Sequence, residues 1–392
     1  MARAARRPGA RQHHKRHSSR ARSAPLAQMH LNAAGIDVGA TEHWVAVPED
    51  RDEEPVQRFG AFTADLYVLA EWLRQCQIAT VVMESTGVSW IALFAVLEER
   101  GCDVKLVDAH QARQVPGRKT DVKDCPWLQE LHTYGVLHGA FRPEDEVGVL
   151  RSSLRQRSML VAMASRAVQH RQQALEQMTL TLTEVVSDMN GQTGMEIIHA
   201  ILAGERDPQR LASHRDRRCK HDQATLAKAL EGPWRAEPLL ALQQALEQDE
   251  FLQQPLQACE QQIDACLQTF VTQGDVDTPP PAPARQRRAR QRHAPGFDVH
   301  GSLAAMTGVD LTQIDGIDAL TALKVISEIG LDMTRWPTGK HFASWLGLCP
   351  GNKVSGGKRS RMRSKPTANR AASALRLAAQ GLVHSHSALG AY

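Results

Sequence analysis

The chain has 392 residues, of which 42% are hydrophobic and 23% are charged, and its formal net charge is +4. This composition is typical of globular proteins and excludes a disordered or fibrous chain. No apolar run approaches the roughly 20 residues that span a bilayer, and the first residues lack the apolar block of a secretory signal. The length predicts at least two folded units. The seven cysteines form no C-x-x-C pair, which argues against a disulfide framework or a zinc knuckle and indicates a reducing cytoplasm.

The basic residues are concentrated in three segments. Residues 1–24, 284–293 and 351–392 contain 21 of the 47 Lys and Arg residues and no acidic residue. Such separation of charge favours a polyanionic partner, with nucleic acid as the leading candidate. For residues 1–30 alone, a basic disordered tail that binds non-specifically is the preferred interpretation.

Residues 31–147 are predicted to form a mixed α/β domain. Alternating apolar residues and Gly turns predict three strands in a meander over residues 35–65. Helical periodicity follows at residues 64–76 and 88–101, and buried strands are predicted at residues 78–86 and 102–110. The order βββαβαβα is the topology of the ribonuclease-H-like fold, a mixed sheet with helices packed on it.

Residues 148–270 are predicted to be helical. Apolar side chains recur at strict seven-residue spacing, at Leu154, Val161, Val168, Leu175 and Leu182. This spacing predicts one long helix with a narrow apolar seam, as in a coiled coil. Arg157 and Arg171 occupy positions that should complete the seam, so we expect it to pack on a second helix from residues 222–270 or on another subunit. An internal hairpin and a dimer interface are equally compatible with the pattern.

The C-terminal third begins after a Pro- and Arg-rich segment, residues 271–300, which predicts an extended linker and a domain boundary. Residues 301–392 predict a small, mainly α-helical domain. Gly316 lies between two apolar helical stretches, as in a helix-hairpin-helix, but Asp318 stands where such hairpins often have a second Gly, and we expect it to cap the second helix. The last predicted helix stops almost where it starts, which we interpret as a truncated end.

Four acidic residues stand out by position. Asp37 lies inside the first strand, Glu84 ends a buried strand, and Asp121 and Asp124 are spaced i, i+3 on one helical face. A buried acid is costly unless a cation or hydrogen bonds compensate it, and magnesium prefers carboxylate oxygens. Two such ions roughly 4 Å apart can hold the attacking and leaving oxygens of a phosphodiester. Each acid taken alone has a structural alternative as a helix cap or a first-turn acid.

Ser355 is a candidate nucleophile. It is followed by Gly356 and Gly357, which leave its hydroxyl sterically open, and by the basic residues Lys358 and Arg359. Attack on phosphorus would store the broken bond as a phosphoserine ester, which allows resealing without a nucleotide cofactor. From the spacing alone, a flexible loop that grips DNA phosphates is the preferred alternative.

Five segments of the sequence, which include the acidic residues and Ser355, resemble one known protein family. The segments GIDVG, VVMESTG, GRKTDVKDCPWLQELHTYG, LTQIDGID and FASWLGLCPGNKVSGGK together resemble the DEDD-type insertion-sequence transposases, often called the "IS one-ten" and "IS eleven-eleven" group. The likeness runs from about residue 30 to the end of the chain. It implies a RuvC-like N-terminal domain in which Asp37, Glu84, Asp121 and Asp124 bind the metal, and a C-terminal domain with Ser355 as the catalytic serine. It also implies donor and target DNA as substrates and a structured bridge RNA as guide.

We therefore predict a magnesium-dependent, RNA-guided DNA recombinase that works as a homo-oligomer, a dimer or tetramer. The rivals are a hydrolytic, structure-selective nuclease that does not need Ser355, and an inactive nucleic-acid-binding remnant. The basic residues next to these motifs and in the linker are predicted to contact nucleic acid: Arg118, Lys119, Lys123, Arg287, Arg288, Lys353, Lys358, Arg359 and Arg361.

Overall fold

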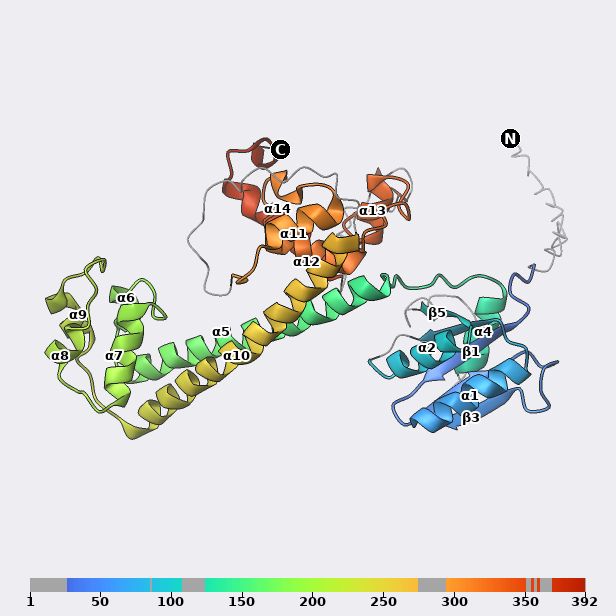
Figure 1. The fold of residues 1–392 in the computed structure, drawn as a ribbon, viewed down its shortest axis with the longest axis horizontal. Helices are drawn as coiled ribbons and strands as arrows, with labels where there is room; N and C mark the ends of the chain where they lie inside the picture. The colour runs from blue at the N-terminus through green and yellow to red at the C-terminus, as the bar shows by residue number, and fades with distance from the viewer. Residues whose placement is uncertain are drawn as a thin grey trace, which may run out of the picture. The chain divides into compact units, whose positions relative to one another are not determined.

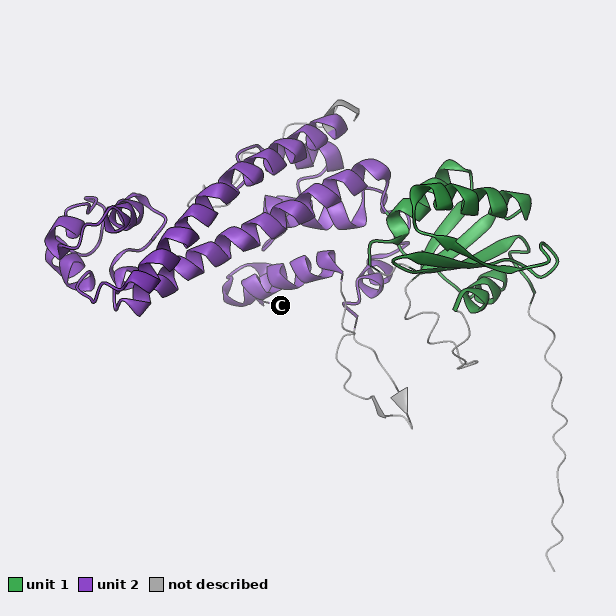
Figure 2. Ribbon diagram, turned by 90° about the horizontal axis from the view of Figure 1, so that it is seen from below, with its two compact units in different colours: residues 1–142 green, residues 143–392 purple. Residues whose placement is uncertain are grey.

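The computed structural model describes residues 27–84, 87–107, 124–273, 294–349, 354–355, 358–359 and 369–391. The chain divides into two compact units, residues 1–142 and residues 143–392 (Figure 2). All seven cysteines are free, as the sequence predicted. No helix within the described ranges is both long and apolar enough to cross a membrane.

The first unit is built on a five-stranded mixed sheet with strand order β3-β2-β1-β4-β5. The strands β1 (Ala33–Val38), β2 (Glu42–Ala46) and β3 (Val56–Gly60) form the predicted antiparallel meander. The strands β4 (Thr80–Glu84) and β5 (Asp103–Val107) continue the sheet in parallel with β1. The predicted strands and the mixed α/β sheet are confirmed.

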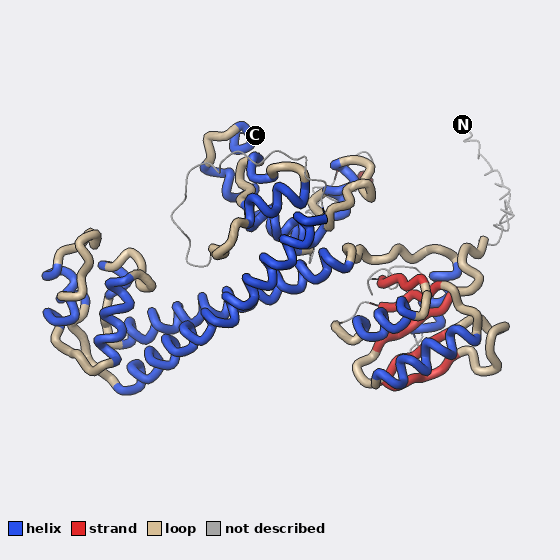
Figure 3. The backbone as a smooth tube through the Cα atoms, in the orientation of Figure 1, coloured by secondary structure: helices blue, strands red, loops and turns tan. Residues whose placement is uncertain are grey.

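Helices cover both faces of this sheet (Figure 3). The helices α1 (Thr63–Gln75) and α2 (Trp90–Glu99) pack on one face, where Ile36 and Met83 join their apolar side chains in the larger core. The helix α4 (Asp124–Thr133) lies on the other face, where Leu128 packs with Val82. Because side chains alternate across a strand, residues next to Ile36 and Met83 in sequence point to the α4 face.

The second unit is organised around two long helices, α5 (Asp145–Gln177) and α10 (Ala236–Gln273), drawn in green and gold in Figure 1. They run antiparallel, because Arg157 pairs with Glu260 and Arg171 pairs with Asp249. The apolar seam of α5 is therefore covered by a helix of the same chain. Of the two packing partners that the sequence left open, the structure has the internal hairpin.

The two arginines in the seam have carboxylate partners that periodicity could not identify. The Arg157 guanidinium donates to Glu260 Oε1 at 2.6 and 2.9 Å. Arg171 is fully buried and donates to Asp249 Oδ2 at 3.0 Å and to Asn190 Oδ1. Buried pairs of this kind are costly to break, because removing one partner leaves an uncompensated charge, and they fix the register of packed helices.

The prediction that the long helix continues through Leu182 is wrong. The helix α5 ends at Gln177, and Thr179 has a positive φ of 56° that a helix does not contain. Leu182 begins the short helix α6 (Leu182–Val185). With α7 (Gln192–Leu202), α8 (Pro208–Ala212) and α9 (Gln223–Ala229), α6 packs on the ends of α5 and α10 where the hairpin closes.

The C-terminal helices pack at the opposite end of the hairpin. They are α11 (Val299–Thr307), α12 (Ala319–Ile329), α13 (Gly339–Trp345), α14 (Arg370–Gly381) and the short α15 (Ala388–Ala391). One apolar core joins these helices, α15 excepted, to residues of α5 and α10 such as Leu150 and Ile263. Arg151 of α5 reinforces the contact by donating to the carbonyl oxygens of Ser327 and Glu328 at the end of α12. The domain boundary in the linker stays a prediction.

The segment around Gly316 matches its predicted local structure on the side of Asp318 but not on the side before Gly316. Gly316 has φ 84°, and Asp318 accepts a hydrogen bond from the backbone N–H of Thr321 at 2.8 Å, which confirms it as the cap of α12. The stretch before Gly316 contains a 3₁₀ turn, Leu311–Gln313, rather than a full helix. Two short strands, β6 (Val354–Ser355) and β7 (Lys358–Arg359), form an antiparallel pair.

Candidate functional site

Three predicted acidic residues lie on the α4 face of the first unit's sheet. Asp37 follows Ile36 in β1, and Glu84 follows Met83 at the end of β4. In the parallel pairing of these strands Ile36 is opposite Met83, so the register continued by one residue brings Asp37 beside Glu84. Adjacent strands lie about 4.8 Å apart, and both side chains point to the same face. The carboxyl ends of parallel strands are the usual place for a site in an α/β sheet.

The third acid, Asp124, is brought to this edge by helix packing. It is the first residue of α4, where the helix dipole favours a negative charge. The helix can approach the sheet because Gly35 has no side chain: an added Cβ there would overlap the carbonyl oxygen of Cys125 and the backbone nitrogen of Gln129. The Gly inside the GIDVG strand was the available sequence signal for this close approach, since glycine in a strand often marks one.

The ionisation of Asp37 is affected by its burial and by the charge of Asp124. Burial in the sheet raises the pKa of Asp37, and the negative charge of Asp124 raises it further. Asp37 and Glu84 are half-buried, whereas Asp124 is exposed. Two carboxylates held this close repel each other when both are ionised, and a bound cation would relieve the repulsion. This donor set of carboxylate oxygens suits a hard divalent ion.

The structure does not describe the side chains of the remaining predicted site residues. Asp121 lies outside the described residues, as do Arg118, Lys119, Lys123, Arg287, Arg288, Lys353 and Arg361. Ser355, Lys358 and Arg359 are described as backbone only, in the β6–β7 pair. Within the described parts of the chain, no three His, Cys, Asp or Glu side chains are close enough to hold a metal ion. The four-acid metal site and the role of Ser355 stay predictions.

A buried histidine anchors α4 at its other end, and no sequence pattern pointed to it. His132 is 1% exposed, its Nε2 lies 2.9 Å from Thr80 Oγ1 of β4, and its ring stacks on that of His30 at 4.8 Å between centroids. Burial, followed by the nearby His30, lowers the pKa of His132 to about 4. Thr80 and His132 are 52 residues apart, so only the tertiary structure pairs them.

Acidification is expected to loosen α4 through His132. Because the pKa of this histidine in the folded protein lies below the usual histidine value of 6.5, the folded state binds fewer protons than the unfolded state between about pH 6.5 and about pH 4. The free energy of unfolding of the first unit should therefore fall across this window, by on the order of 2 kcal/mol. Urea unfolding of the full chain at several pH values measures the free energy of unfolding. Hydrogen exchange of the α4 amides at the same pH values measures the loosening of this helix.

His132→Gln is the matched variant, because glutamine can still hydrogen-bond Thr80 but does not titrate. Its stability should depend less on pH over the same window than that of the wild type. Equal pH dependence in the two proteins would assign the effect to other groups.

Two family models match this chain. The model for DEDD transposases of the IS110 type, described as "Transposase", matches residues 34–180, and a model described as "Transposase IS116/IS110/IS902 family" matches residues 308–392. The first range contains the carboxylates on the sheet edge, and the second contains Ser355. No curated protein matches the chain.

Proposed function

Because the chain belongs to the IS110 family of DEDD transposases, we propose that it is a magnesium-dependent DNA recombinase that cuts and rejoins strands through Ser355 under the direction of a guide RNA. Membership of the family makes the chain a transposase that acts on DNA. We propose, beyond this family-level activity, that the chain uses magnesium, a serine nucleophile and a guide RNA, and that it works as a homo-oligomer. The observation that carries the proposal is the approach of Asp124 to Asp37 on the sheet edge where Glu84 ends its strand.

In the proposed site Asp37, Glu84, Asp121 and Asp124 act as one set of ligands in a RuvC-like domain. A bound divalent ion would supply positive charge to the oxygens of the scissile phosphodiester. Glu84 and Asp37 are placed by paired strands, so their spacing is fixed by the sheet, whereas Asp124 depends on how closely α4 packs. Four carboxylates would supply enough oxygen ligands to hold two such ions.

Ser355 is proposed as the nucleophile. Its Oγ would give up its proton and form a bond to phosphorus as the bond between phosphorus and one deoxyribose oxygen breaks, and that oxygen would take up the proton and leave as a hydroxyl. The resulting phosphoserine ester keeps the energy of the broken bond, so that a hydroxyl of a second strand can reverse the step and restore the serine. Basic residues on both sides, Lys353 and Lys358 among them, would hold the phosphate backbone.

Ser355→Ala is expected to abolish the covalent protein–DNA species. Wild-type protein incubated with magnesium, its co-purifying RNA and labelled, nicked donor DNA should yield a labelled band that survives denaturing electrophoresis. The variant should give no such band, because alanine has no oxygen to bond to phosphorus. Ser360→Ala, in the same basic segment, is the matched control and should form the band as the wild type does.

The other outcomes identify the rival functions. A Ser355→Ala protein that still cuts DNA with release of free ends would be a hydrolytic nuclease that uses the carboxylates alone. A wild-type protein that binds DNA without cutting it, with or without RNA, would be an inactive remnant. Loss of joined products after ribonuclease treatment is the result expected if the RNA is the guide.

A further inference from the structure

A second charged site lies in the part of the chain that neither family model matches, between residues 180 and 308. It is a cavity of about 570 Å³ between α7 and the loop that joins α8 to α9. The loop contributes His214, Arg215, Arg217 and Arg218 to the lining. Residues 213–220 contain four basic residues and one acidic residue, in a central region that is otherwise acidic.

The loop is held in place by a hydrogen bond to α7 and by hydrogen bonds within the loop itself. The backbone N–H of Asp216 donates to Thr193 Oγ1 of α7 at 3.0 Å. Arg215 donates through Nε to the carbonyl oxygen of His221 at 2.6 Å and through Nη2 to that of Cys219 at 2.7 Å. These contacts make the cavity a pre-formed feature of the fold, which lowers the entropic cost of binding a ligand there.

The two carboxylates that line the cavity are engaged by neighbouring side chains. Asp216 is paired with Arg218, whose Nε lies 2.9 Å from Oδ1. Glu196 accepts a hydrogen bond from Gln192 at 2.9 Å and lies 3.5 Å from Nδ1 of His214. The hydrogen bonds of Arg215 go instead to carbonyl oxygens, which carry no net charge, and Arg217 is exposed. Positive charge is therefore left over in the cavity.

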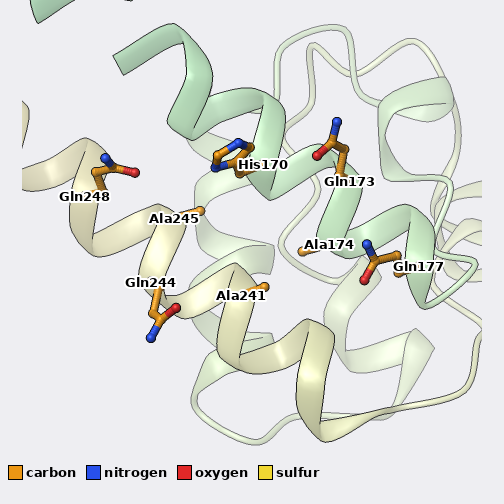
Figure 4. Close-up of a pocket in the computed structure, with 8 residues that line it drawn as sticks. All are labelled: His170, Gln173, Ala174, Gln177, Ala241, Gln244, Ala245 and Gln248. Atoms are coloured by element: carbon orange, nitrogen blue, oxygen red, sulfur yellow. The ribbon is translucent and has the colours of Figure 1, made fainter. Parts of the chain in front are cut away.

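A cavity in the hairpin itself lacks this character. It has a volume of about 260 Å³ and is lined by glutamine and alanine side chains with His170, from α5 and α10 (Figure 4). No side chain of fixed charge faces it. The arginine cavity therefore differs from this gap between helices in having charged side chains in its lining.

Arginine recognises phosphate through the two parallel N–H donors of its planar guanidinium group. A transposase meets phosphate groups chiefly on nucleic acid, where backbone contacts position the partner without reading its sequence. We propose that this cavity binds a phosphate of a nucleic-acid backbone, with Arg217 as the contacting side chain and Arg215 adding positive charge beside it. The proposed contact uses neither the carboxylates nor Ser355. It can therefore be tested by measuring nucleic-acid binding, and no cleavage assay is needed.

The test is the salt dependence of binding for the full-length chain. The slope of log affinity against log salt concentration is negative, and each phosphate contact that is lost should reduce its magnitude by roughly 0.7 to 0.9. Arg217→Gln should cause this loss and leave the fold unchanged, because the side chain is exposed. Charge reversal in Arg217→Glu should weaken affinity further, by about tenfold at low salt.

Arg210→Gln is the matched control. Arg210 is an equally charged, exposed residue of the adjacent helix α8, but its guanidinium already lies 3.5 Å from Glu205 and 3.7 Å from Asp207. This variant removes the same net charge from the same region and should keep the wild-type slope. The measurements use a DNA duplex and an RNA duplex, each of about 20 base pairs, as separate arms, a length of roughly two helical turns.

A reduced salt slope in the Arg217 variants, with no such change in Arg210→Gln, supports the proposal. Whether the reduction is seen with DNA, with RNA or with both identifies the source of the phosphate. Slower hydrogen exchange of residues 213–221 on adding the same duplex would locate the contact. Equal slopes for wild type and Arg217→Gln in both arms, or equal losses for Arg217→Gln and Arg210→Gln, would overturn the proposal. These results do not depend on whether Ser355 is the nucleophile.

Discussion

Asp37→Asn is expected to lower metal-dependent DNA strand cleavage by about a thousandfold or more, because it removes one negative charge from the carboxylates that we propose as the metal ligands. The substitution keeps the size of the side chain, so the sheet should pack as before. Cleavage of labelled donor DNA under single-turnover conditions, with magnesium in excess, measures the loss.

The same variant should be at least as stable as the wild type without metal. Burial and the charge of Asp124 raise the pKa of Asp37, so ionising this carboxyl costs more in the folded protein than in the unfolded chain. The cost is present at neutral pH, which lies above the usual aspartate pKa of 3.8, and asparagine removes it. Loss of activity without loss of stability distinguishes a ligand from a structural residue.

Asp103→Asn is the control for this prediction. Asp103 is exposed and begins β5, where it pairs with Thr80 at the start of β4. It therefore lies at the opposite end of the parallel strands from Glu84. It should cleave DNA as the wild type does. Full activity of Asp37→Asn, or equal losses in the two variants, would refute the assignment of the sheet edge as the cleavage site.

Gly35→Ala is expected to damage both stability and activity. The new Cβ would overlap two backbone atoms of α4, the Cys125 carbonyl oxygen and the Gln129 nitrogen, and helix backbone cannot rotate away as a side chain can. The helix must therefore move off the sheet, which should cost on the order of 2 to 4 kcal/mol in the stability of the first unit. Because Asp124 moves with α4, cleavage should fall by about a hundredfold even where the protein is still folded.

Gly148→Ala separates this effect from a general intolerance of alanine. Gly148 lies in the first turns of α5, and an added Cβ would meet no atom within 4 Å. Alanine favours the helix by about 1 kcal/mol over glycine, so this variant should be as stable as the wild type or more so, and fully active. Urea unfolding and the cleavage assay, run on both variants, give the comparison. A Gly35→Ala protein with wild-type stability and rate would mean that α4 does not need its close approach.

The sequence by itself determined the elements of the first unit and the identity of its family. Alternating apolar residues and glycine turns are local signals, and they placed the strands that carry Asp37 and Glu84. Asp318 was predicted as a cap from its position before a helix, and its bond to Thr321 confirms it. Local signals of this kind are reliable because backbone geometry and neighbouring side chains act within a few residues.

Only the tertiary structure decided which distant residues meet. Periodicity predicted an apolar seam with Arg157 and Arg171 in it, but their partners Glu260 and Asp249 lie 103 and 78 residues away. It also extended the long helix to Leu182, because seven-residue spacing continues across the turn at Thr179, where the chain leaves the helix to enclose a separate core. In the same way, the approach of Asp124 to Asp37 and the arginine cavity beside α7 depend on helix packing, which brings together side chains that no local pattern relates.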